Sequence, residues 1–576
     1  MQARDLIIPH FKAHRRIIGV GLFSLIVVDF AQLMIPRIVK WAVDDLTAFS
    51  ADLGQLLRYA AAVCAMALLI GCFRYIWRRC LLGTARRLEE TLRNRLLHHV
   101  QTLSSDYFDQ VKTGDLMAHA TNDIQQVRMA AGMGLVAFND AIVLGAAAVG
   151  FMLYIDVRLT LYVLIPMPLI VLITRLLGRR MHRRYQQVQA SFADLTEAVR
   201  EHCAGIRMIK AHHGEAAASK TIQKVSQTYI DENIKLVGVT GLFFPLMMLL
   251  TNLSLALVLL FGGRRAILAE ITTGDFVAFI GYLNLLAWPM MALGWVTNLI
   301  QRGGASLERL KTILEREPGI CDPPRAQSLK RIDGHLAFEG LWFAYNGQWV
   351  LKNIDQRLNA GEILGIVGPP GSGKSTLLGL VPRLYDAQRG CIRIDGTDLR
   401  DIRLTDLRRQ MAFVPQEPFL FAGTLRENIL FGCSKADTSQ LQRAVADAGL
   451  SDTVASMPAG LDTVVGEKGI LLSGGQKQRV ALARALLIDA PILLLDDPVS
   501  QVDTATGRII IDSIRRMAGR KTILIASHRL AALRFADHIM TLENGDLIEC
   551  GTHDQLVHDG GYYARVFALQ ELEDAV

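Results

Sequence analysis

The sequence lacks the patterns that identify several large classes of protein. Its eight cysteines are scattered and no two stand at metal-ligand spacing, so we predict no cysteine metal site and interpret them as small buried hydrophobic residues in a reducing compartment. No basic stripe with interleaved aromatic residues occurs, which argues against a nucleic-acid partner. Residues 1–16 lead into a long apolar run without a small-residue cleavage site, so we expect no removable signal peptide.

Long apolar runs, in contrast, fill the first half of the chain. Hydrophobic residues make up 51% of the 576 residues and the mean hydropathy is positive, which is unusual for a soluble protein of this length. Runs of about 20 apolar residues can cross a bilayer as helices. We predict six membrane spans, approximately residues 17–39, 59–77, 136–154, 159–177, 236–261 and 276–300.

Basic residues predict how these spans are oriented. The connections after the second and fourth spans are long, polar and rich in helix formers, so we expect the spans to continue as helices beyond the membrane. These two connections are rich in Arg and Lys, whereas the short connections carry only Arg158, Arg264 and Arg265. The asymmetry predicts that the long connections, the N-terminus and everything after the sixth span are cytoplasmic.

The chain changes character after residue 320. Residues 321–335 are rich in proline and polar residues and are predicted to form a linker. Residues 336–576 alternate short apolar strands with helical stretches and glycine turns, the pattern of an α/β domain. The predicted fold is an all-α six-helix transmembrane domain over residues 1–320, with long cytoplasmic helical extensions, followed by an α/β P-loop ATPase domain.

A phosphate-binding loop lies near the start of the α/β domain. The stretch "GPPGSGKST" fits G-x-x-x-x-G-K-[ST], follows the apolar strand "EILGIV" and opens a helix. Its glycines would turn backbone N–H groups onto phosphate oxygens, Lys374 would reach the outer phosphates of ATP, and Ser375 would ligate Mg²⁺. The residues predicted to bind ATP are Gly368, Pro369, Pro370, Gly371, Ser372, Gly373, Lys374, Ser375 and Thr376.

Two later segments add a metal-binding acid and a second anion site. Asp496 ends the apolar strand "ILLLD", and its carboxylate can hold magnesium through water. In "LLSGGQKQR", Ser473, Gly474 and Gly475 expose backbone N–H groups at the start of a helix. One ATP needs only one phosphate loop, so this second segment is predicted to grip the nucleotide of another copy.

The order of these motifs resembles that of ATP-binding-cassette (ABC) transporters, in which "LSGGQ" lies between a phosphate loop and a strand such as "LLLDD". The resemblance implies that Ser473, Gly474, Gly475 and Gln476 act on a partner's ATP. It also assigns Tyr345 to the adenine ring, Gln416 to magnesium and to contact with the membrane domain, Asp503 to a dimer-contact loop, and His528 to a switch histidine.

The membrane half is similar to that of bacterial multidrug-type half-exporters. The tips at residues 104–115 and 205–215 resemble the coupling helices of that family. The resemblance implies ATP-driven export of a hydrophobic or amphipathic compound across the bacterial inner membrane, by two such chains in the lipid bilayer, with ATP and Mg²⁺ as cofactors. The transport pathway is expected to include Asp29, Gln32, Asn139 and Asp140, although helix-to-helix hydrogen bonding is the alternative interpretation of the polar residues within the spans.

Asp497 departs from the family pattern, which has glutamate after the metal-binding acid. The glutamate polarises the water that attacks the outer phosphate, and aspartate falls short of its reach by roughly 1.5 Å, one C–C bond. A misplacement of ~1 Å can cost on the order of 100-fold in rate. The shorter side chain predicts a slow site, and because the family contains heterodimers in which one chain carries this change, the resemblance implies a partner chain that carries glutamate. His528 is present, so a slow homodimeric flippase for lipid or drug, or a nucleotide-gated channel on the same fold, stays open.

Overall fold

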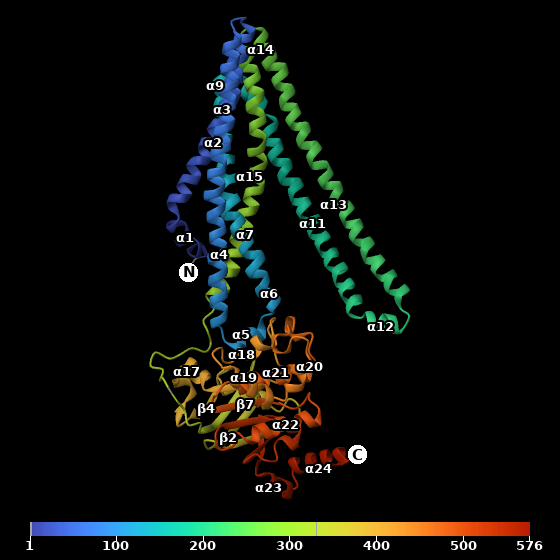
Figure 1. Cartoon of the computed structure of the whole chain (residues 1–576). Coiled ribbons are helices and arrows are strands. Elements are labelled where there is room, and N and C mark those ends of the chain that lie inside the picture. Colours follow the sequence, from blue (N-terminus) through green and yellow to red (C-terminus); the bar gives the residue numbers. More distant parts are fainter. Residues whose placement is uncertain (1–2, 330, 576) are drawn as a thin grey trace. The chain divides into compact units, whose positions relative to one another are not determined.

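The computed structural model describes residues 3–329 and 331–575, which form two compact units. The first unit contains residues up to 101 and residues 112–316, and the second contains residues 102–111 and those from 317 onward. The described part of the first unit is helical, and the second holds two β-sheets with their covering helices (Figure 1). The predicted fold class, an all-α domain followed by an α/β domain, is confirmed.

Within the described residues, five continuous helical stretches are long and apolar enough to cross a membrane. The fourth predicted span, residues 159–177, falls on α10 (Val157–Leu164) and the start of α11 (Pro166–Ala204), where several side chains lie outside the described residues. The number of six spans therefore stays a prediction. The five stretches are Arg15–Thr47, Leu53–Thr102, Thr113–Ile155, Glu215–Ile267 and Thr273–Leu314.

Polar caps mark where these helices begin. Asp52 and Gln55 form a capping box at the start of α3 (Leu53–Trp77), and Thr272 and Asp275 form another at the start of α15 (Thr273–Leu314). Each box satisfies backbone N–H groups that have no partner within the first helical turn. The sequence thereby sets the residues at which these two helices begin.

Several of the long helices contain a π-helical turn, which adds a residue to one turn of the helix. One such turn, η2 (Arg78–Leu82), joins α3 to α4 (Gly83–Thr102). Three more π-helical turns interrupt the helix that begins with α6 (Thr113–Ala118): η3 (His119–Asp123), η4 (Ala130–Gly134) and η5 (Asp140–Leu144). The α-helical segments that alternate with them are α7 (Ile124–Met129), α8 (Leu135–Asn139) and α9 (Gly145–Ile155). Asp140, one of the predicted pathway residues, is the first residue of η5.

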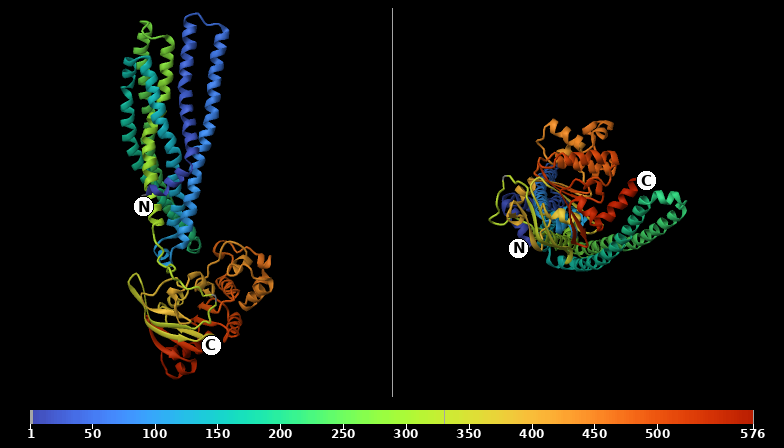
Figure 2. Two further views of the ribbon diagram at one scale, coloured as in Figure 1. Left: turned by 90° about the vertical axis from the view of Figure 1, so that its left-hand side faces the viewer. Right: turned by 90° about the horizontal axis from the view of Figure 1, so that it is seen from below.

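A long hairpin diverges from the other helices of the first unit (Figure 1). It consists of α11, the short α12 (Ile206–Ala211) and α13 (Glu215–Leu257), which continues through η6 (Val258–Gly262) into α14 (Gly263–Ile267). The remaining helices, α2 (Arg15–Thr47), α3 with α4, α6 to α9, and α15, run beside one another (Figures 1 and 2). The hairpin places α12 far from this bundle.

The cysteines are not all buried, and that part of the prediction is wrong. Cys64, Cys72, Cys203, Cys321 and Cys550 are exposed in this chain, while the other three are half-buried. Cys64 and Cys72 lie on α3, in an apolar stretch with little burial inside the chain. Such a helix turns its apolar side chains outward, because lipid replaces water as the surrounding solvent.

The second unit contains a four-stranded sheet and a six-stranded sheet. The first has the order β2-β1-β4-β5 and is antiparallel, with β1 (Leu336–Tyr345), β2 (Gln348–Leu358), β4 (Arg389–Ile394) and β5 (Thr397–Asp398). The second has the order β10-β9-β3-β8-β7-β6 and is parallel except for β10 (Asp546–Gly551). Its other strands are β3 (Ile363–Val367), β6 (Met411–Val414), β7 (Ile492–Asp496), β8 (Thr522–Ala526) and β9 (His538–Glu543).

Burial on both faces explains why the central strands are apolar throughout. In β3, Leu364 and Ile366 pack into the core shared with the four-stranded sheet, while Ile363 and Val367 pack into the core beneath the helices of the opposite face. Every residue of β3, β7 and β8 is buried. The core therefore holds the carboxyl ends of these three strands in fixed positions, side by side.

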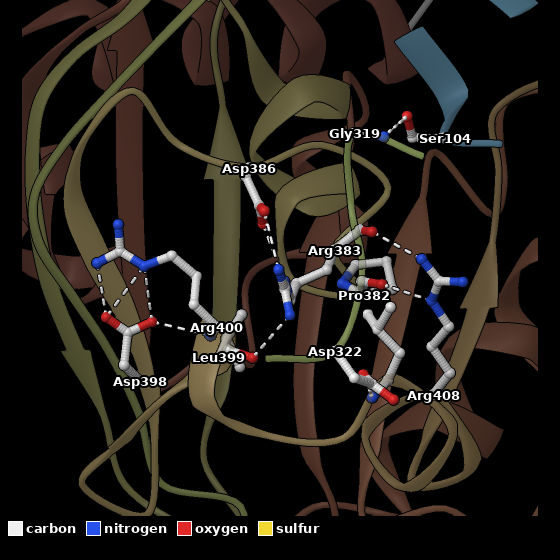
Figure 3. A network of polar contacts seen from close by, with 11 residues as sticks. Ser104, Gly319, Asp322, Pro382, Arg383, Asp386, Asp398, Leu399, Arg400 and Arg408 are labelled. Atoms are coloured by element: carbon white, nitrogen blue, oxygen red, sulfur yellow. Dashed lines mark hydrogen bonds and ion pairs between the residues drawn. The ribbon is translucent and has the colours of Figure 1, made fainter. Parts of the chain in front are cut away.

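The helices of the second unit include two that begin directly after motif residues, α16 (Lys374–Leu380) and α21 (Gly474–Leu486). The segment before β1 is hydrogen-bonded to this unit rather than free of it. Gln327 donates its backbone N–H to the Asp401 carbonyl at 2.7 Å, and the Asp322 carboxylate accepts from the Leu404 N–H at 2.7 Å (Figure 3). Further helices are α5 (Ser105–Gln110), α17 (Leu404–Arg409), α18 (Leu425–Leu430), α19 (Thr438–Asp447), α20 (Ser451–Ser456), α22 (Thr504–Arg515), α23 (His553–His558) and α24 (Tyr562–Ala575).

Candidate functional site

The glycines of the phosphate loop have backbone conformations that other residues rarely adopt. Gly368, Gly371 and Gly373 have φ of 154°, 80° and 99°. A Cβ at Gly368 would lie 2.2 Å from the Leu542 carbonyl oxygen, so this position also lacks the space for a side chain. The sequence between β3 and α16 is therefore dictated by the path of the backbone as well as by the phosphates that it is predicted to bind.

Lys374 is held inside this loop. Its ammonium group donates hydrogen bonds to the carbonyl oxygens of Gly368 and Pro369, both at 2.9 Å, and only 7% of the residue is exposed. Burial lowers the pKa of Lys374, and the nearby carboxylates of Asp496 and Asp497 oppose this shift. The group is a cation kept in a mainly dry position, where an arriving phosphate would gain a strong charge-assisted hydrogen bond.

A cavity of about 340 Å³ lies over the loop and the ends of β7 and β8. It brings together the phosphate loop and three residues from elsewhere in the sequence that were predicted to act on ATP, Gln416, Asp497 and His528. Its lining consists of Val350, Pro370, Gly371, Gly373, Lys374, Ser375, Thr376, Gln416, Asp496, Asp497, Ala526, Ser527 and His528. Gly368, Pro369 and Ser372 belong to the same loop but lie outside this lining.

Three candidate ligands for magnesium, Ser375, Gln416 and Asp496, line the cavity. Asp496 is 4% exposed, and burial raises the pKa of its carboxyl group, with the Asp497 charge adding to the effect and a hydrogen bond from Ser375 opposing it. Gln416 lines the same cavity. One carboxylate with hydroxyl and amide oxygens, completed by phosphate and water, suits the preference of Mg²⁺ for few protein ligands. A bound cation would also relieve the cost of two buried neighbouring carboxylates.

Asp497 has a constrained backbone and a fixed carboxylate. Its φ is 51°, in the left-handed region that aspartate tolerates better than most residues, and its N–H donates to the Ala526 carbonyl at 2.8 Å. The Ser527 hydroxyl donates to the Asp497 carboxylate at 3.2 Å. The side-chain amide of Gln478 donates to the Asp497 carbonyl oxygen. Sequence reasoning assigned no role to Ser527 or Gln478, although Ser527 directly precedes His528 and Gln478 lies within the quoted segment "LLSGGQKQR".

His528 is attached to the C-terminal helix. Its carbonyl oxygen accepts a hydrogen bond from the Gln570 side chain at 2.6 Å, and Gln570 also accepts from the Leu530 N–H at 2.9 Å. The loop after β8 is thereby fixed by α24, which lies far along the chain. No sequence motif marks Gln570.

The predicted signature segment lies outside this cavity. Ser473 caps α21 through a capping box with Gln476, and Ser473 and Gly474 are exposed. A Cβ on Gly474 would meet the Gln501 side chain at 2.3 Å, and one on Gly475 would meet the Gln501 carbonyl oxygen at 2.3 Å. The glycines thus have a second role besides exposing N–H groups, which is to let the segment pack against residues 500–503.

Asp503 caps a helix at the end of that segment. Its carboxylate accepts from the Thr506 N–H at 2.9 Å, at the start of α22, and the residue is exposed. The cap gives Asp503 a structural role within this chain. A dimer-contact role remains a prediction.

Tyr345 is not part of the cavity lining but belongs to an aromatic cluster. Its ring packs edge-on against Phe343 and Tyr385, with centroids 4.7 and 5.3 Å apart respectively. The Tyr385 hydroxyl donates to the Asp109 carboxylate at 2.9 Å, and burial, together with this bond, raises the pKa of Tyr385. Tyr345, the predicted adenine-binding residue, is therefore separated only by the Tyr385 ring from Asp109 in the first predicted tip, a connection that the sequence does not reveal.

Further polar contacts lie near this segment within the second unit (Figure 3). Ser104 accepts from the Gly319 N–H at 3.2 Å. The nearly buried Arg383 forms two hydrogen bonds with Asp386, at 2.8 and 2.9 Å. Arg408 donates to the carbonyl oxygens of Pro382 and Arg383 at 3.0 and 2.7 Å. The network fixes the loop that carries Tyr385.

The predicted pathway residues of the first unit also lie together. Asn139 donates from its side-chain amide to the Asp29 carboxylate at 3.0 Å. Asp29, Gln32 and Asp140 line a cavity of about 260 Å³ between α2, α3, η5 and α15. The structure thus brings these four positions together, although they come from helices that are distant in sequence.

Comparison with known proteins gives matches to both units. The family model "ABC transporter transmembrane region" matches residues 18–290, and the family model "ABC transporter" matches residues 351–500. The multidrug resistance-like ATP-binding protein MdlA of Escherichia coli (strain K12) is 34% identical over 563 residues, covering 98% of this chain and 95% of that protein. The ATP-dependent lipid A-core flippase of Syntrophus aciditrophicus (strain SB) is 32% identical over 567 residues, covering 98% and 94%.

A solved structure matches over nearly the whole length. The structure of a bacterial Atm1-family ABC exporter with ATP bound has a TM-score of 0.80 and 26% sequence identity, covering 96% of this chain and 98% of that one. The probable multidrug resistance ABC transporter ATP-binding/permease protein YheI of Bacillus subtilis (strain 168) is 34% identical over 567 residues, covering 98% and 96%.

Proposed function

Because this chain belongs to the ABC transporters, as an exporter with its transmembrane region and ATPase fused in one polypeptide, we propose that it exports a hydrophobic or amphipathic compound across the bacterial inner membrane as one half of a dimer. The main observation in support of this proposal is the 340 Å³ cavity, in which Lys374, Asp496 and Asp497 lie together at the phosphate loop. These residues supply a cation for phosphate, an acid for metal and an acid for water.

Each residue then has a defined task in hydrolysis. The loop N–H groups and Lys374 hold the outer phosphates and stabilise the charge that develops on them. Magnesium, when bound by Ser375, Gln416 and Asp496, would neutralise phosphate charge. Asp497 accepts a hydrogen bond from the attacking water, while His528 contacts the departing phosphate.

Asp497 makes this site the slower one of a heterodimer. Its carboxylate falls short of a glutamate's reach by roughly 1.5 Å, and one of its oxygens is already bonded to Ser527. The exposed Ser473 and Gly474 serve the other site, where the partner chain supplies a glutamate. In this arrangement, the site that contains Asp497 mainly binds ATP without hydrolysing it. Hydrolysis takes place at the second site, on the other side of the dimer interface.

Exposed apolar side chains on α12 support the proposal that the protein works together with a second chain. Ile206 and Met208 are 46% and 63% exposed at a tip that the charge distribution predicts to be cytoplasmic. An apolar tip in water favours a protein partner. We assign it to the ATPase domain of the other subunit.

The test compares ATPase activity of the chain alone with that of the chain and a glutamate-bearing partner half-exporter. We expect little activity alone and robust activity from the pair. Asp497→Asn should lower the activity of the pair far less than Glu→Gln in the partner. Robust activity of the chain alone that disappears in Asp497→Asn would instead establish a homodimer in which Asp497 is an ordinary catalytic acid.

Two alternative functions, a homodimeric flippase and a nucleotide-gated channel, are each consistent with an observation. A homodimeric flippase with slow turnover is consistent with His528 in the cavity and with the lipid A-core flippase among the similar proteins. A nucleotide-gated channel would need little hydrolysis, as Asp497 permits. Stimulation of the ATPase by a transported compound favours the pump, and nucleotide-gated conductance favours the channel.

A further inference from the structure

The side chain of Gln570, on α24, forms hydrogen bonds at both of its ends to the loop that carries His528. Its Nε2 group donates to the His528 carbonyl oxygen at 2.6 Å, and its Oε1 atom accepts from the Leu530 N–H at 2.9 Å. The carbonyl needs a donor and the N–H needs an acceptor, so these two partners determine the orientation of the amide. Both ends of one side chain are thus used on one three-residue segment, which fixes the path of that segment.

The segment held by Gln570 connects the ATP cavity to a short helix. His528 lines the 340 Å³ cavity, and Leu530 is the first residue of η10 (Leu530–Ala532). N–H groups in the first turn of a helix have no partner within the helix, so Gln570 supplies the missing acceptor from a distant part of the chain. Gln570 lies outside the described lining of the cavity, and its route to bound nucleotide therefore passes through this loop.

Packing of α24 against the domain core determines where the Gln570 side chain lies. Tyr563, Phe567 and Gln570 follow one another at helical spacing, so they share one face of the helix. Tyr563 is fully buried in the same apolar core as Leu530, and Phe567 packs against that core. The Arg534 guanidinium lies over the Phe567 ring at 4.6 Å. The C-terminal helix is therefore a packed element of the ATPase domain, with Gln570 at the end of its buried face.

We propose that Gln570 is a positioning residue for ATP hydrolysis, whose amide holds the His528 backbone so that the imidazole stays at the ATP cavity. The proposal rests on the role of His528 in the function proposed above, and it makes that role depend on the C-terminal helix. A displacement of ~1 Å of a reacting group can cost on the order of 100-fold in rate. Because Gln570 lies outside the cavity, its loss should change the rate of hydrolysis and not the affinity for ATP.

The test separates the two hydrogen bonds by substitution. Gln570→Ala removes both of them. Gln570→Glu has the same shape as the wild-type residue and keeps an acceptor for the Leu530 N–H, but it has no N–H to donate and places a negative charge beside the His528 carbonyl oxygen. We expect both variants to lower the single-turnover rate of hydrolysis by on the order of tenfold, with unchanged affinity for ATP.

Hydrolysis is measured with the full-length chain. Where a glutamate-bearing partner is needed for activity, that partner carries Glu→Gln, so that the rate reports the site of this chain. Binding of a labelled ATP analogue gives the affinity, and thermal unfolding reports whether each variant is folded. If Gln570→Ala does not fold, Gln570→Glu decides the question.

Two comparisons separate positioning of His528 from general attachment of the helix. Glu571→Gln breaks the ion pair between Glu571 and Arg534, at 2.8 Å, which also holds α24, but leaves the Gln570 amide in place. This control should keep the wild-type rate. In the double variant Gln570→Ala/His528→Ala, the rate should equal that of His528→Ala, because the loop then has no imidazole to position.

Three results would overturn the proposal: a wild-type rate in Gln570→Glu, equal losses in Glu571→Gln and Gln570→Ala, or a further loss when Gln570→Ala is added to His528→Ala. In each case Gln570 would have a role in stability alone, while the function proposed above would stand. A wild-type rate in His528→Ala would refute the role assigned to His528 and this proposal with it. The export function is judged separately, and ATP-dependent transport that persists in Lys374→Ala would refute it.

Discussion

The two polar cavities of this protein are built in different ways. In the ATPase domain, the acids follow directly after a buried strand, and glycines with positive φ set the path of the phosphate loop. In the membrane domain, Asp29, Arg74 and Asp140 come from three helical segments, and nothing local in the sequence connects them. The first cavity is defined by short-range backbone geometry and the second by helix packing, so single substitutions should act differently on them.

The largest expected effect is that of Lys374→Ala. It removes a buried cation that would form charge-assisted hydrogen bonds with phosphate, worth ~2–3 kcal/mol, so ATP affinity should fall on the order of 30-fold to 100-fold. Photolabelling with an ATP analogue measures this. Lys521→Ala, which removes a half-buried lysine paired with Asp489 outside the cavity, is the control, and equal labelling of both variants would show that the 340 Å³ cavity is not the ATP site.

Asp497→Glu tests the proposal that the reach of this side chain alone makes the site slow. Restoring about 1.5 Å of side chain should raise the hydrolysis rate at this site by on the order of tenfold to 100-fold, provided that His528 is in place. Single-turnover hydrolysis measures it, with Asp497→Glu/His528→Ala as the control that should lose the gain. A rate that stays at the wild-type level would mean that the contact with Ser527, rather than length, limits the acid.

Gly475→Ala tests whether packing explains the signature glycines. The new Cβ would meet the Gln501 carbonyl at 2.3 Å, whereas Gly379→Ala meets nothing within 4 Å. We expect Gly475→Ala to lower the free energy of unfolding by about 1–3 kcal/mol without nucleotide, and Gly379→Ala to lower it far less. Thermal unfolding of the full chain is the measurement. A loss that appears only with ATP would assign the glycine to the partner's nucleotide alone.

Tyr385→Phe should have the smallest effect. It removes the hydrogen bond to Asp109, a bond to a charged group worth ~1.5–3 kcal/mol at most, but keeps the ring against Tyr345. Stimulation of ATPase by a transported compound should fall by about twofold to fivefold while ATP affinity is unchanged. Tyr59→Phe, which loses a similar bond to Asp45 at 2.6 Å, should leave the stimulation unchanged. Equal losses in both variants would show that the Tyr385–Asp109 hydrogen bond has no specific part in the stimulation of the ATPase by the transported compound.

The sequence predicted those parts of the protein that local chemistry dictates. The phosphate loop, the acid-ended strand and the signature helix each need particular residues at fixed spacing, so the fold class and most of the positions that line the 340 Å³ cavity could be named in advance. Contacts made by ordinary residues across large sequence distances could not be. Gln478 and Gln570 are one example and Tyr385 with Asp109 another, because nothing in their neighbours' sequence indicates their partners.

The cysteine prediction was wrong for a related reason. It assumed that small apolar residues are buried inside the chain, but Cys64 and Cys72 lie on a membrane helix whose surroundings are lipid. Side-chain polarity predicts the solvent that a residue prefers, and in this half of the chain that solvent is outside the protein.

The left-handed backbone at Asp497 also limits how this position can change in evolution. One base substitution converts an aspartate codon to a codon for Asn, His, Tyr, Gly, Ala, Val or Glu. Of these, Asn, His and Gly tolerate a φ of 51° best, and none carries a negative charge at neutral pH. Neutral drift from aspartate would therefore remove the negative charge at this position. Glutamate in a descendant lineage would be the mark of selection for faster hydrolysis.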